Sequence, residues 1–284
     1  MLTGRFHRDP AAIGAVSRAR RMKPAEWEAT IDSRTVAAVF ETCETAIDPE
    51  AVAALVRERI AATPEIAPRL GTTVTAVSDL GSGFAVDFTT ADGRGREVYD
   101  HVVNATWEGR LAIDASLGLR PERPWLWRLR RIARVLTPDA SRLVSVTTLL
   151  GPFGDVANFG GGALFMSWYP SGRIGISREP APSAWQPAAS TEPGSGEAGL
   201  IDGLGAIVPG VATLLRRLDT RVRWLHGAVF AWGSSDIDDP GSYLHRRYEI
   251  GVHSHGRYHS IDTSKYTTAP LFALEAADRV CGKD

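Results

Sequence analysis

The chain has 284 residues, of which 44% are apolar and 23% charged, and its formal net charge is −1. This length and composition exclude a disordered chain and suffice for a large core, in one large domain or two interleaved ones. A charge balance this close to zero gives no overall field that would attract nucleic acid or an anionic membrane. We therefore expect neither of them as a partner.

Cysteine usage and the N-terminal sequence indicate the compartment. Cys43 and Cys281 are the two cysteines, and they form neither a disulfide framework nor a metal-ligand pattern, which favours a reducing environment. The first ten residues lack the apolar core of a signal peptide. No apolar run approaches the ~18 residues of a transmembrane helix. We expect a soluble, cytoplasmic protein.

The N-terminal part begins irregularly and leads into a helix. The first forty residues are basic and predict one or two short helices, and residues 36–47 have a β-like pattern. Asp48 followed by Pro49 is a strong helix start, because Asp caps the first turn and Pro fits the first helical position. The helix that follows has its apolar positions on one face: Val52, Leu55, Val56 and Ile60.

Strand patterns dominate the middle of the chain. Strands are predicted at residues 71–79, 84–89, 96–103, 125–135, 142–150, 163–169, 173–177 and 222–231. Turns are predicted at 151–154 and 160–162, a flexible loop at 180–199, and helices near 197–207 and 210–218. The strand 96–103 runs into small polar residues, which indicates a strand tip that opens onto a crevice where ligands of α/β sheets bind.

The most informative segment is residues 251–270, which is rich in His, Tyr, Ser and Thr and contains Lys265. It leads directly into an apolar, helix-like tail at residues 271–281. A polar loop that feeds a helix N-terminus favours an electron-rich ligand, because unpaired N–H groups and the helix dipole both point toward it. The segment therefore predicts a cofactor or anion site.

Three other motifs have simpler interpretations. Residues 194–199 match G-x-G-x-x-G, but a Pro- and Ser-rich linker precedes them instead of a strand, which favours a loop. The arginines of residues 120–134 are typical of a strand with one solvated basic face, although one of them could bind a substrate carboxylate. No G-x-S-x-G turn supports a hydrolase.

The histidines of the C-terminal segment leave a metal site as a weaker alternative. His253, His255 and His259 lie close in sequence, and imidazole binds Zn, Fe or Ni. Apart from Asp262, no carboxylate or thiolate completes a ligand set at local spacing. The histidines are better interpreted as hydrogen-bonding groups in a loop, and we predict no metal.

Three blocks of the sequence resemble the D-amino-acid-oxidase-like family of FAD-dependent oxidoreductases. The first is residues 44–107, with Ala-Ile-Asp-Pro at 46–49, Gly-Thr-Thr-Val-Thr-Ala-Val at 71–77 and Val-Val-Asn-Ala-Thr-Trp at 102–107. The second is residues 151–170, and the third is the C-terminal segment with its helix. The resemblance covers most of residues 40–282.

The resemblance implies an α/β (α+β) fold, in which an FAD/NAD(P)-binding-type sheet is interleaved with a β-rich substrate domain. The implied parts are an N-terminal remnant of the substrate domain at 1–47, FAD-domain elements at 48–116, the substrate domain at 117–230, and a flavin-contacting loop and helix at 231–284.

One departure from the family is large. The family begins with a strand, a G-x-G-x-x-G turn and a helix that hold the FAD pyrophosphate, yet before residue 71 this chain has only Gly4 and Gly14. The acidic residue that should follow and bind ribose is absent as well. The chain therefore resembles a truncated member without its first βαβ unit, which counts against activity of this chain alone.

Residue roles follow from the resemblance. It implies that Val74 lies near the adenine, and that Asn104, Ala105 and Thr106 line the FAD crevice. It places the following residues near the isoalloxazine ring: Tyr258, His259, Ser260, Asp262, Thr263 and Lys265. Tyr258, His259 and Lys265 are the candidate catalytic residues. Lys265 together with a helix N-terminus would stabilise the negative charge of a reduced flavin, although it could instead only cap or solvate the loop.

The resemblance thus implies an FAD-dependent oxidoreductase that removes a hydride from a C–H next to an amine or hydroxyl of a small molecule. The alternative is a non-catalytic remnant or binding protein that keeps the scaffold but cannot hold FAD. This alternative predicts an exposed apolar sheet edge where the first βαβ unit should pack, which a partner or the missing segment would cover.

Overall fold

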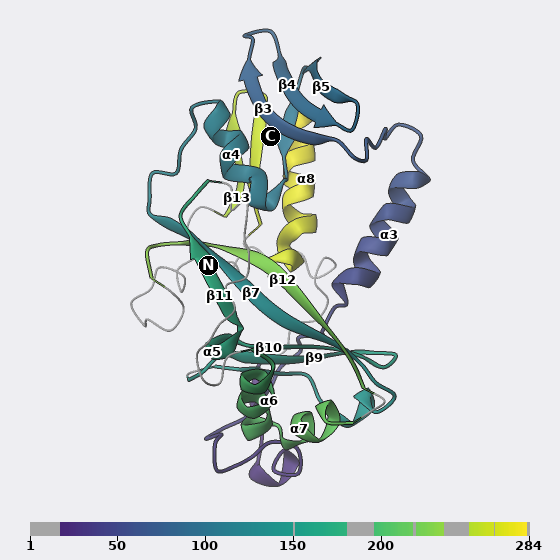
Figure 1. Cartoon of the computed structure of the whole chain (residues 1–284), viewed down its shortest axis with the longest axis vertical. Coiled ribbons are helices and arrows are strands. Elements are labelled where there is room, and N and C mark those ends of the chain that lie inside the picture. Colours follow the sequence, from purple (N-terminus) through teal and green to yellow (C-terminus); the bar gives the residue numbers. More distant parts are fainter. Residues whose placement is uncertain are drawn as a thin grey trace. The chain divides into compact units, whose positions relative to one another are not determined.

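The computed structural model describes residues 18–149, 151–180, 196–217, 220–235, 250–263 and 265–282. These residues form a mixed α/β protein with several sheets, as the sequence predicts (Figure 1). The chain divides into two compact units. Unit 1 comprises the described residues of Met1–Asp48, Arg131–Gly172 and Ser190–Leu225, and unit 2 those of Pro49–Arg130, Arg173–Ala189 and His226–Asp284.

A six-stranded sheet contains two long strands, β7 (Trp125–Leu136) and β12 (Arg221–Trp232), which pair with each other. Apart from β12, the strands follow the order β11-β7-β10-β9-β8 in the sheet. These strands are β8 (Val146–Thr148), β9 (Gly154–Gly160), β10 (Ala163–Trp168) and β11 (Arg173–Ser177). Four strand pairs of this sheet are antiparallel: β8–β9, β9–β10, β10–β7 and β11–β7.

The core of unit 1 lies between this sheet and two helices, α6 (Gly196–Ile207) and α7 (Pro209–Leu215). Met166 and Trp168 of β10 pack there against Leu204 of α6. Gly203 permits this approach, because a Cβ atom at that position would lie 2.2 Å from the indole of Trp168. The short elements of unit 1 are β1 (Arg20–Arg21), η1 (Pro24–Glu26), β2 (Phe40–Glu41), η3 (Ala140–Arg142) and α5 (Tyr169–Gly172).

Unit 2 contains two three-stranded sheets. One is the antiparallel meander of β3 (Thr73–Asp79), β4 (Phe84–Thr90) and β5 (Gly93–Tyr99). The other has the order β13-β14-β6, formed by β13 (Gly251–His255), β14 (Tyr258–Asp262) and β6 (Val102–Asn104). β13 and β14 are an antiparallel hairpin, whereas β14 and β6 are parallel. The segment around residues 251–262, expected as a loop, is therefore a pair of strands.

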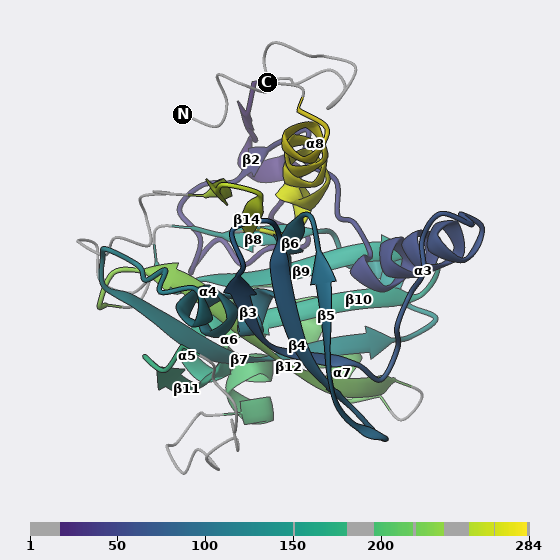
Figure 2. The same cartoon turned by 90° about the horizontal axis from the view of Figure 1, so that it is seen from above.

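Two helices cover the sheet of β13, β14 and β6. α8 (Ala269–Val280), which follows η5 (Tyr266–Thr268), lies beside β14 (Figure 2). Its Phe272 and Ala276 pack against Val252 and Ile261 of the hairpin. α4 (Arg110–Ser116), which follows η2 (Trp107–Gly109), contacts β14 and β6 and also β3. The predicted helical tail at residues 271–281 is thus confirmed, with a start two residues earlier.

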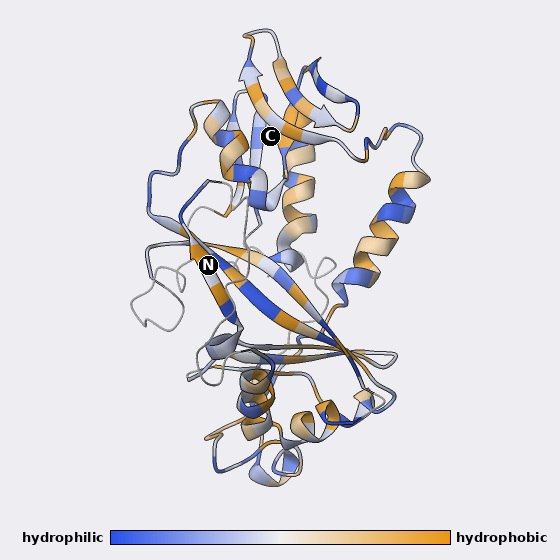
Figure 3. Ribbon diagram, viewed as in Figure 1, coloured by the Kyte–Doolittle hydropathy of each residue, from blue (hydrophilic) through white to orange (hydrophobic). Residues whose placement is uncertain are grey.

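The helix α3 (Pro49–Ala61) begins at the predicted Asp48-Pro49 signal, yet it has no buried residue. Leu55 and Val56 of its apolar face are 65% and 51% exposed. In both cartoon views α3 stands clear of the other elements of unit 2 (Figures 1 and 2), and Figure 3 shows hydrophobic positions along it. Within the described residues, the predicted amphipathic helix therefore forms without a core to pack on.

Two strand predictions need correction. Of residues 36–47 only Phe40–Glu41 pairs as a strand, with β1. The strand expected at 96–103 is two strands, because the chain breaks at Asp100 and His101. β5 stays in the meander, whereas β6 joins β14 in a different sheet. A continuous apolar pattern cannot reveal such a change of sheet.

The region expected as turns and one strand at 142–162 also differs. β8 is only three residues long, and β9 lies where mainly turns were expected. Asp155 and Asn158 hide this strand in the sequence, because both residue types disfavour strands. Here Asp155 accepts a bond from Ser167, and Asn158 donates to the carbonyls of Ala140 and Leu143. Residues 181–195, most of the expected flexible loop, lie outside the described residues.

None of the helices in the described ranges is long and apolar enough to cross a membrane.

Candidate functional site

The parallel strands β6 and β14 end at the same edge of their sheet. Ser260 pairs in register with Asn104, so the residues that follow each strand continue from neighbouring positions. Ala105 and Thr106 follow β6, and Thr263 and Lys265 follow β14. We call this the carboxyl edge. Ligands of open α/β sheets bind at such edges, and the residues that follow Val103 in the sequence predict such a site here.

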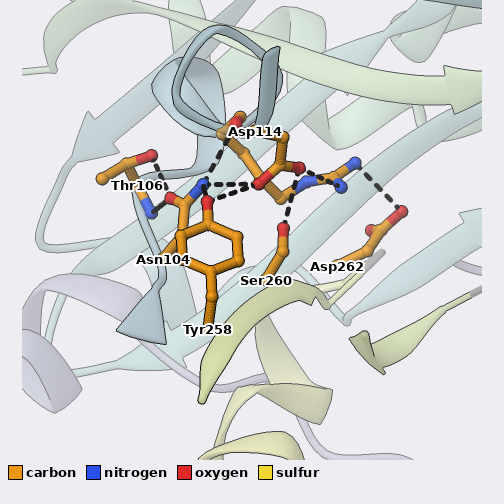
Figure 4. A network of polar contacts seen from close by, with 7 residues as sticks. Asn104, Thr106, Asp114, Tyr258, Ser260 and Asp262 are labelled. Carbon is orange, nitrogen blue, oxygen red and sulfur yellow. Dashed lines mark hydrogen bonds and ion pairs between the residues drawn. The ribbon is translucent and has the colours of Figure 1, made fainter. Parts of the chain in front are cut away.

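A buried polar network lies beside this edge and centres on the carboxylate of Asp114 in α4 (Figure 4). Asp114 accepts hydrogen bonds from the hydroxyl of Tyr258 at 2.6 Å, the hydroxyl of Ser260 at 2.9 Å and the amide of Asn104 at 2.9 Å. Three residues predicted as site residues are thus brought together, but by a fourth that was not predicted.

Arg110 extends the network toward the end of β14. Its guanidinium is 3.5 Å from the carboxylates of both Asp114 and Asp262, and all three side chains are buried. It also lies 5.0 Å from the ring centroid of Phe230. Because a buried charge is tolerated only when it is paired, these contacts tie α4 to the carboxyl edge.

Tyr258 is fully buried inside this network. Burial first, and then the hydrogen bond it donates to Asp114, raise the pKa of its hydroxyl well above the ordinary value. The hydroxyl therefore stays protonated and acts as a fixed donor at neutral pH. A catalytic role of Tyr258 stays a prediction. In the structure its hydroxyl links β14 to α4 through the hydrogen bond to Asp114.

His259 lies on the other face of β14, toward α8. Its Nδ1 is 2.8 Å from the hydroxyl of Ser254, which in turn accepts a bond from Arg279 of α8 at 2.7 Å. Its ring stacks on that of His101, with centroids 6.1 Å apart. The structure therefore places His259 away from Tyr258 and Ser260, among residues near the start of the strand.

Burial lowers the pKa of His259, and the charges of His101 and Arg279 lower it further. The folded protein thus resists a proton that the unfolded chain accepts near pH 6.5. The free energy of unfolding should be fully retained above that pH and should fall as the pH drops from 6.5 toward the lowered pKa. His259→Gln should remove this component, as urea unfolding at about pH 8 and about pH 5 would show. An equal effect of the substitution at both pH values would contradict it.

The backbone is strained where the chain leaves β6. Trp107 has φ +51°, the only non-Gly residue with positive φ among those described, and its indole donates to the carbonyl of Ala228 at 2.9 Å. For a bulky residue this conformation is unfavourable and needs surrounding contacts to hold it. Ala105 and Thr106 just before it are exposed, and Thr106 donates to Asn104.

The chain after β14 leads to the N-terminus of α8. Thr268, the N-cap, does not cap the helix with its side chain; its hydroxyl donates to the carbonyls of Thr263 and Lys265 instead. Lys265 is exposed and lies at the N-cap of η5. A cation and an uncapped helix start therefore both stand at the carboxyl edge, which favours negative charge there.

Val74 is the predicted site residue that lies farthest from this arrangement in the topology. It belongs to β3 of the meander, a different sheet, and is 36% exposed. The network does not include it. Its predicted contact with adenine stays a prediction.

Sequence reasoning missed Arg110 and Asp114. Their spacing of four residues on a helix was the available signal, because such pairs share a helix face. This spacing is a weak signal, because most charged pairs four residues apart on a helix lie on its solvent-exposed face.

Sequence reasoning also missed an aromatic cluster on β7 and β12. The cluster consists of Trp107, Trp125, Trp127, Phe230 and Trp232. The expected solvated basic face of β7 is wrong in this part, because Arg128 and Arg130 are only 4% and 7% exposed. β7 is covered on both faces here, and its arginines are buried among protein groups.

The metal alternative has no support in the described residues, where no three His, Cys, Asp or Glu side chains gather. The register shows why. His253 pairs with Ser260 and His255 with Tyr258, so both share a sheet face that His259 does not.

The fold is similar to those of three solved enzymes, in agreement with the resemblance in the sequence. Glycine oxidase from Geobacillus kaustophilus matches 99% of this chain and 67% of its own, with a TM-score of 0.58 and 15% identity. L-Proline dehydrogenase from P. horikoshii matches 94% of this chain and 65% of its own, with a TM-score of 0.60 and 15% identity. Iminodiacetate oxidase from Chelativorans sp. BNC1 matches 100% of this chain and 69% of its own, with a TM-score of 0.56 and 17% identity.

The chain thus spans about two thirds of the length of these enzymes. No protein-family model and no curated protein sequence matches it. At this identity the similarity is one of fold.

Proposed function

We propose that this chain is part of an FAD-dependent oxidoreductase that removes a hydride from a C–H next to an amine or hydroxyl of a small molecule. The observation that carries the proposal is the shared fold with three enzymes named for glycine, proline and iminodiacetate. Each of these compounds has a C–H beside an amine nitrogen. An amine is therefore the favoured substrate.

The residues of the carboxyl edge fit the ring end of FAD. Lys265 and the uncapped N-terminus of α8 would supply positive charge where a reduced flavin is negative, and Ala105 and Thr106, which follow the neighbouring strand, are exposed. A counterpart for the pyrophosphate end is not found in the described residues, where no glycine-rich turn joins a strand of the β6–β14 sheet to a helix. The described part of the chain therefore offers residues for the ring end of an FAD site alone.

The roles of the chain's own residues follow from these contacts. A bound flavin would supply the acceptor for the hydride. Lys265 would stabilise negative charge at the ring, and the backbone at Thr263 and Thr106 would line it. The network of Asp114 and Arg110 would hold both strand ends in place, since a site must be fixed to within a fraction of an ångström to be effective.

Anaerobic mixing tests this function. The purified chain is supplied with FAD and then with glycine, L-proline or iminodiacetate, and the visible absorption of oxidised flavin is followed. We expect at least one amine to bleach it, while FAD and amine without protein stay coloured. Persistent colour with all three amines, on a chain that has bound the flavin, would contradict the proposal for these substrates.

A non-catalytic binding protein on the same scaffold is the second candidate, and the bare face of α3 favours it. A 13-residue helix is marginal in water unless its apolar face is packed. β6 is also an edge strand in the described sheet, and its Val103 is 42% exposed. We propose that a further polypeptide segment covers α3 and this edge in the working protein.

The double substitution Leu55→Glu with Val56→Glu tests whether α3 is bare in this chain. Because both side chains are exposed, we expect the free energy of unfolding to change by no more than about 0.5 kcal/mol and the soluble fraction to rise. Val77→Glu, at a position only 1% exposed, should unfold the protein. A loss of stability in the α3 variant comparable to that of a core substitution would show that the chain itself covers the helix.

A further inference from the structure

The C-terminal end of α8 is tied to the β13–β14 hairpin by a short chain of hydrogen bonds. Arg279, in the last turn of the helix, donates to the hydroxyl of Ser254 at 2.7 Å. The same hydroxyl oxygen lies 2.8 Å from Nδ1 of His259, which pairs in register with Ser254 across the hairpin. One chain of contacts therefore joins α8, β13 and β14.

The protons along this chain have a direction while His259 is neutral. A guanidinium only donates, so the Ser254 oxygen accepts from Arg279, and its own proton is available for the acceptor nitrogen of the neutral ring. A second proton on His259 makes Nδ1 a donor, because both ring nitrogens of an imidazolium carry hydrogen. The hydroxyl would then lie between two cations and could donate to neither of them.

The surroundings of His259 do not favour a positive charge. His259 is only 3% exposed, and its Nε2 is buried without a hydrogen-bond partner. The neighbouring ring is that of His101, at the bend between β5 and β6, with centroids 6.1 Å apart. Nδ1 of His101 is also buried without a partner. Two imidazoles this close and this poorly solvated cannot both be charged without strong repulsion.

The other groups beside the two histidines come from α8, β13 and β6. α8 contributes Arg279 and Glu275, and the carboxylate of Glu275 accepts a bond from Arg279 at 2.5 Å. The residues in register with His259 are uncharged: Ser254 on β13 and Val103 on β6. Within the described part of the chain, a second proton on His259 would therefore be a buried charge without a carboxylate partner, which is unfavourable.

We propose that Arg279, Ser254, His259 and His101 form a pH-sensitive latch, which holds the last turn of α8 on the hairpin at neutral pH and releases it in mildly acidic solution. The sign follows from the contacts. Opening lets His259 reach water and accept a proton near pH 6.5, whereas the closed latch resists that proton. Opening should therefore become more favourable below pH 6.5, by up to about tenfold per pH unit.

Release of the latch would affect the carboxyl edge, because α8 extends from one to the other. The N-terminus of α8 lies at that edge, and its last turn contains Arg279. Between the two ends, Phe272 and Ala276 pack on the hairpin. A helix that is loose at one end positions the other end less firmly, so acid should weaken the binding of an anionic ligand at the edge. This effect on flavin rests on the proposed function, whereas the latch itself does not.

Hydrogen–deuterium exchange read by mass spectrometry tests the latch. The whole chain is exchanged at about pH 7 and about pH 5.5, and the rates are corrected for those of an unstructured peptide at each pH. We expect the opening constant of residues 276–282 to rise about tenfold at the lower pH. At both pH values it should exceed that of β4, whose buried residues report global unfolding.

Three substitutions separate the latch from other effects. In His259→Gln the pH dependence of the last turn should disappear, because an amide does not titrate in this range. His255→Gln is the matched control, an exposed histidine on the opposite face of the same hairpin, and it should keep the full rise. Ser254→Ala, at an exposed position, should raise the opening constant at neutral pH about fivefold, because it breaks the chain of hydrogen bonds.

A last turn that opens equally at both pH values would overturn the proposal, as would a rise that persists in His259→Gln. Binding of FAD at the same two pH values distinguishes this failure from failure of the proposed function. A pH-dependent last turn in a folded chain that never binds FAD would keep the latch and remove the oxidoreductase. FAD bound equally tightly at both pH values, by a chain whose last turn opens in acid, would remove the effect of the latch on the carboxyl edge.

Discussion

Replacing Asp114 by Ala should lower the free energy of unfolding by about 3–5 kcal/mol. Asp114 is 6% exposed, and its carboxylate accepts bonds from Asn104, Tyr258 and Ser260, while it also pairs with Arg110. Removal would leave the buried hydroxyls of Tyr258 and Ser260 without this acceptor, whereas the Asn104 amide would keep the carbonyl of Arg110. The buried guanidinium of Arg110 would keep only the carboxylate of Asp262. Since the free energy of unfolding of a typical domain is only about 5–15 kcal/mol, the variant should unfold at a urea concentration well below the wild-type midpoint.

Urea unfolding followed by circular dichroism measures this change. Asp87→Ala is the control, because Asp87 forms an ion pair with Arg96 at the surface and its loss should have a much smaller effect. Asp114→Asn keeps the shape and should lie between the two. Similar transitions for Asp114→Ala and Asp87→Ala would show that the network does not hold unit 2 together.

Replacing Lys265 by Met should slow amine-dependent reduction of bound flavin by about 10²–10³-fold, the usual effect of removing one stabilising group from a developing negative charge. Lys265 is exposed, so the melting temperature should hardly change. Rapid mixing without oxygen measures the rate.

Lys265→Arg keeps the charge and should restore part of the rate, whereas Lys23→Met, an exposed lysine of unit 1, should leave it unchanged. A Lys265→Met variant that reduces flavin at the wild-type rate would assign Lys265 to capping or solvation, the simpler of its two interpretations.

Much of the fold could be predicted because its signals are local. The Asp48-Pro49 start of α3, the alternating residues of β4 and the apolar face of α8 each fix an element from a few neighbouring positions. The division of residues 96–103 between two sheets could not be predicted, since it depends on partners far away in sequence. β9 was hidden for a similar reason, because the side-chain amide of Asn158 donates to the carbonyls of Ala140 and Leu143, at and just after η3.

The candidate site could be predicted only in outline. The resemblance implied that Asn104 lines the FAD crevice and that Tyr258, Ser260 and Asp262 lie near the flavin ring. Their contact with flavin stays a prediction, but the structure does bring these four residues into one network. The sequence could not reveal that Asp114 accepts the hydrogen bonds of Asn104, Tyr258 and Ser260. Nor could it reveal that Arg110 pairs with Asp262.

Equilibrium binding of FAD to the purified chain is the measurement that tests the central claim most directly. Titration followed by the visible spectrum and by flavin fluorescence should show uptake of one flavin per chain, with a perturbed spectrum that the Lys265→Met variant alters. A flavin that keeps the spectrum and fluorescence of the free compound at every protein concentration, in a chain shown to be folded, would contradict the assignment of the carboxyl edge of β6 and β14 as a flavin site.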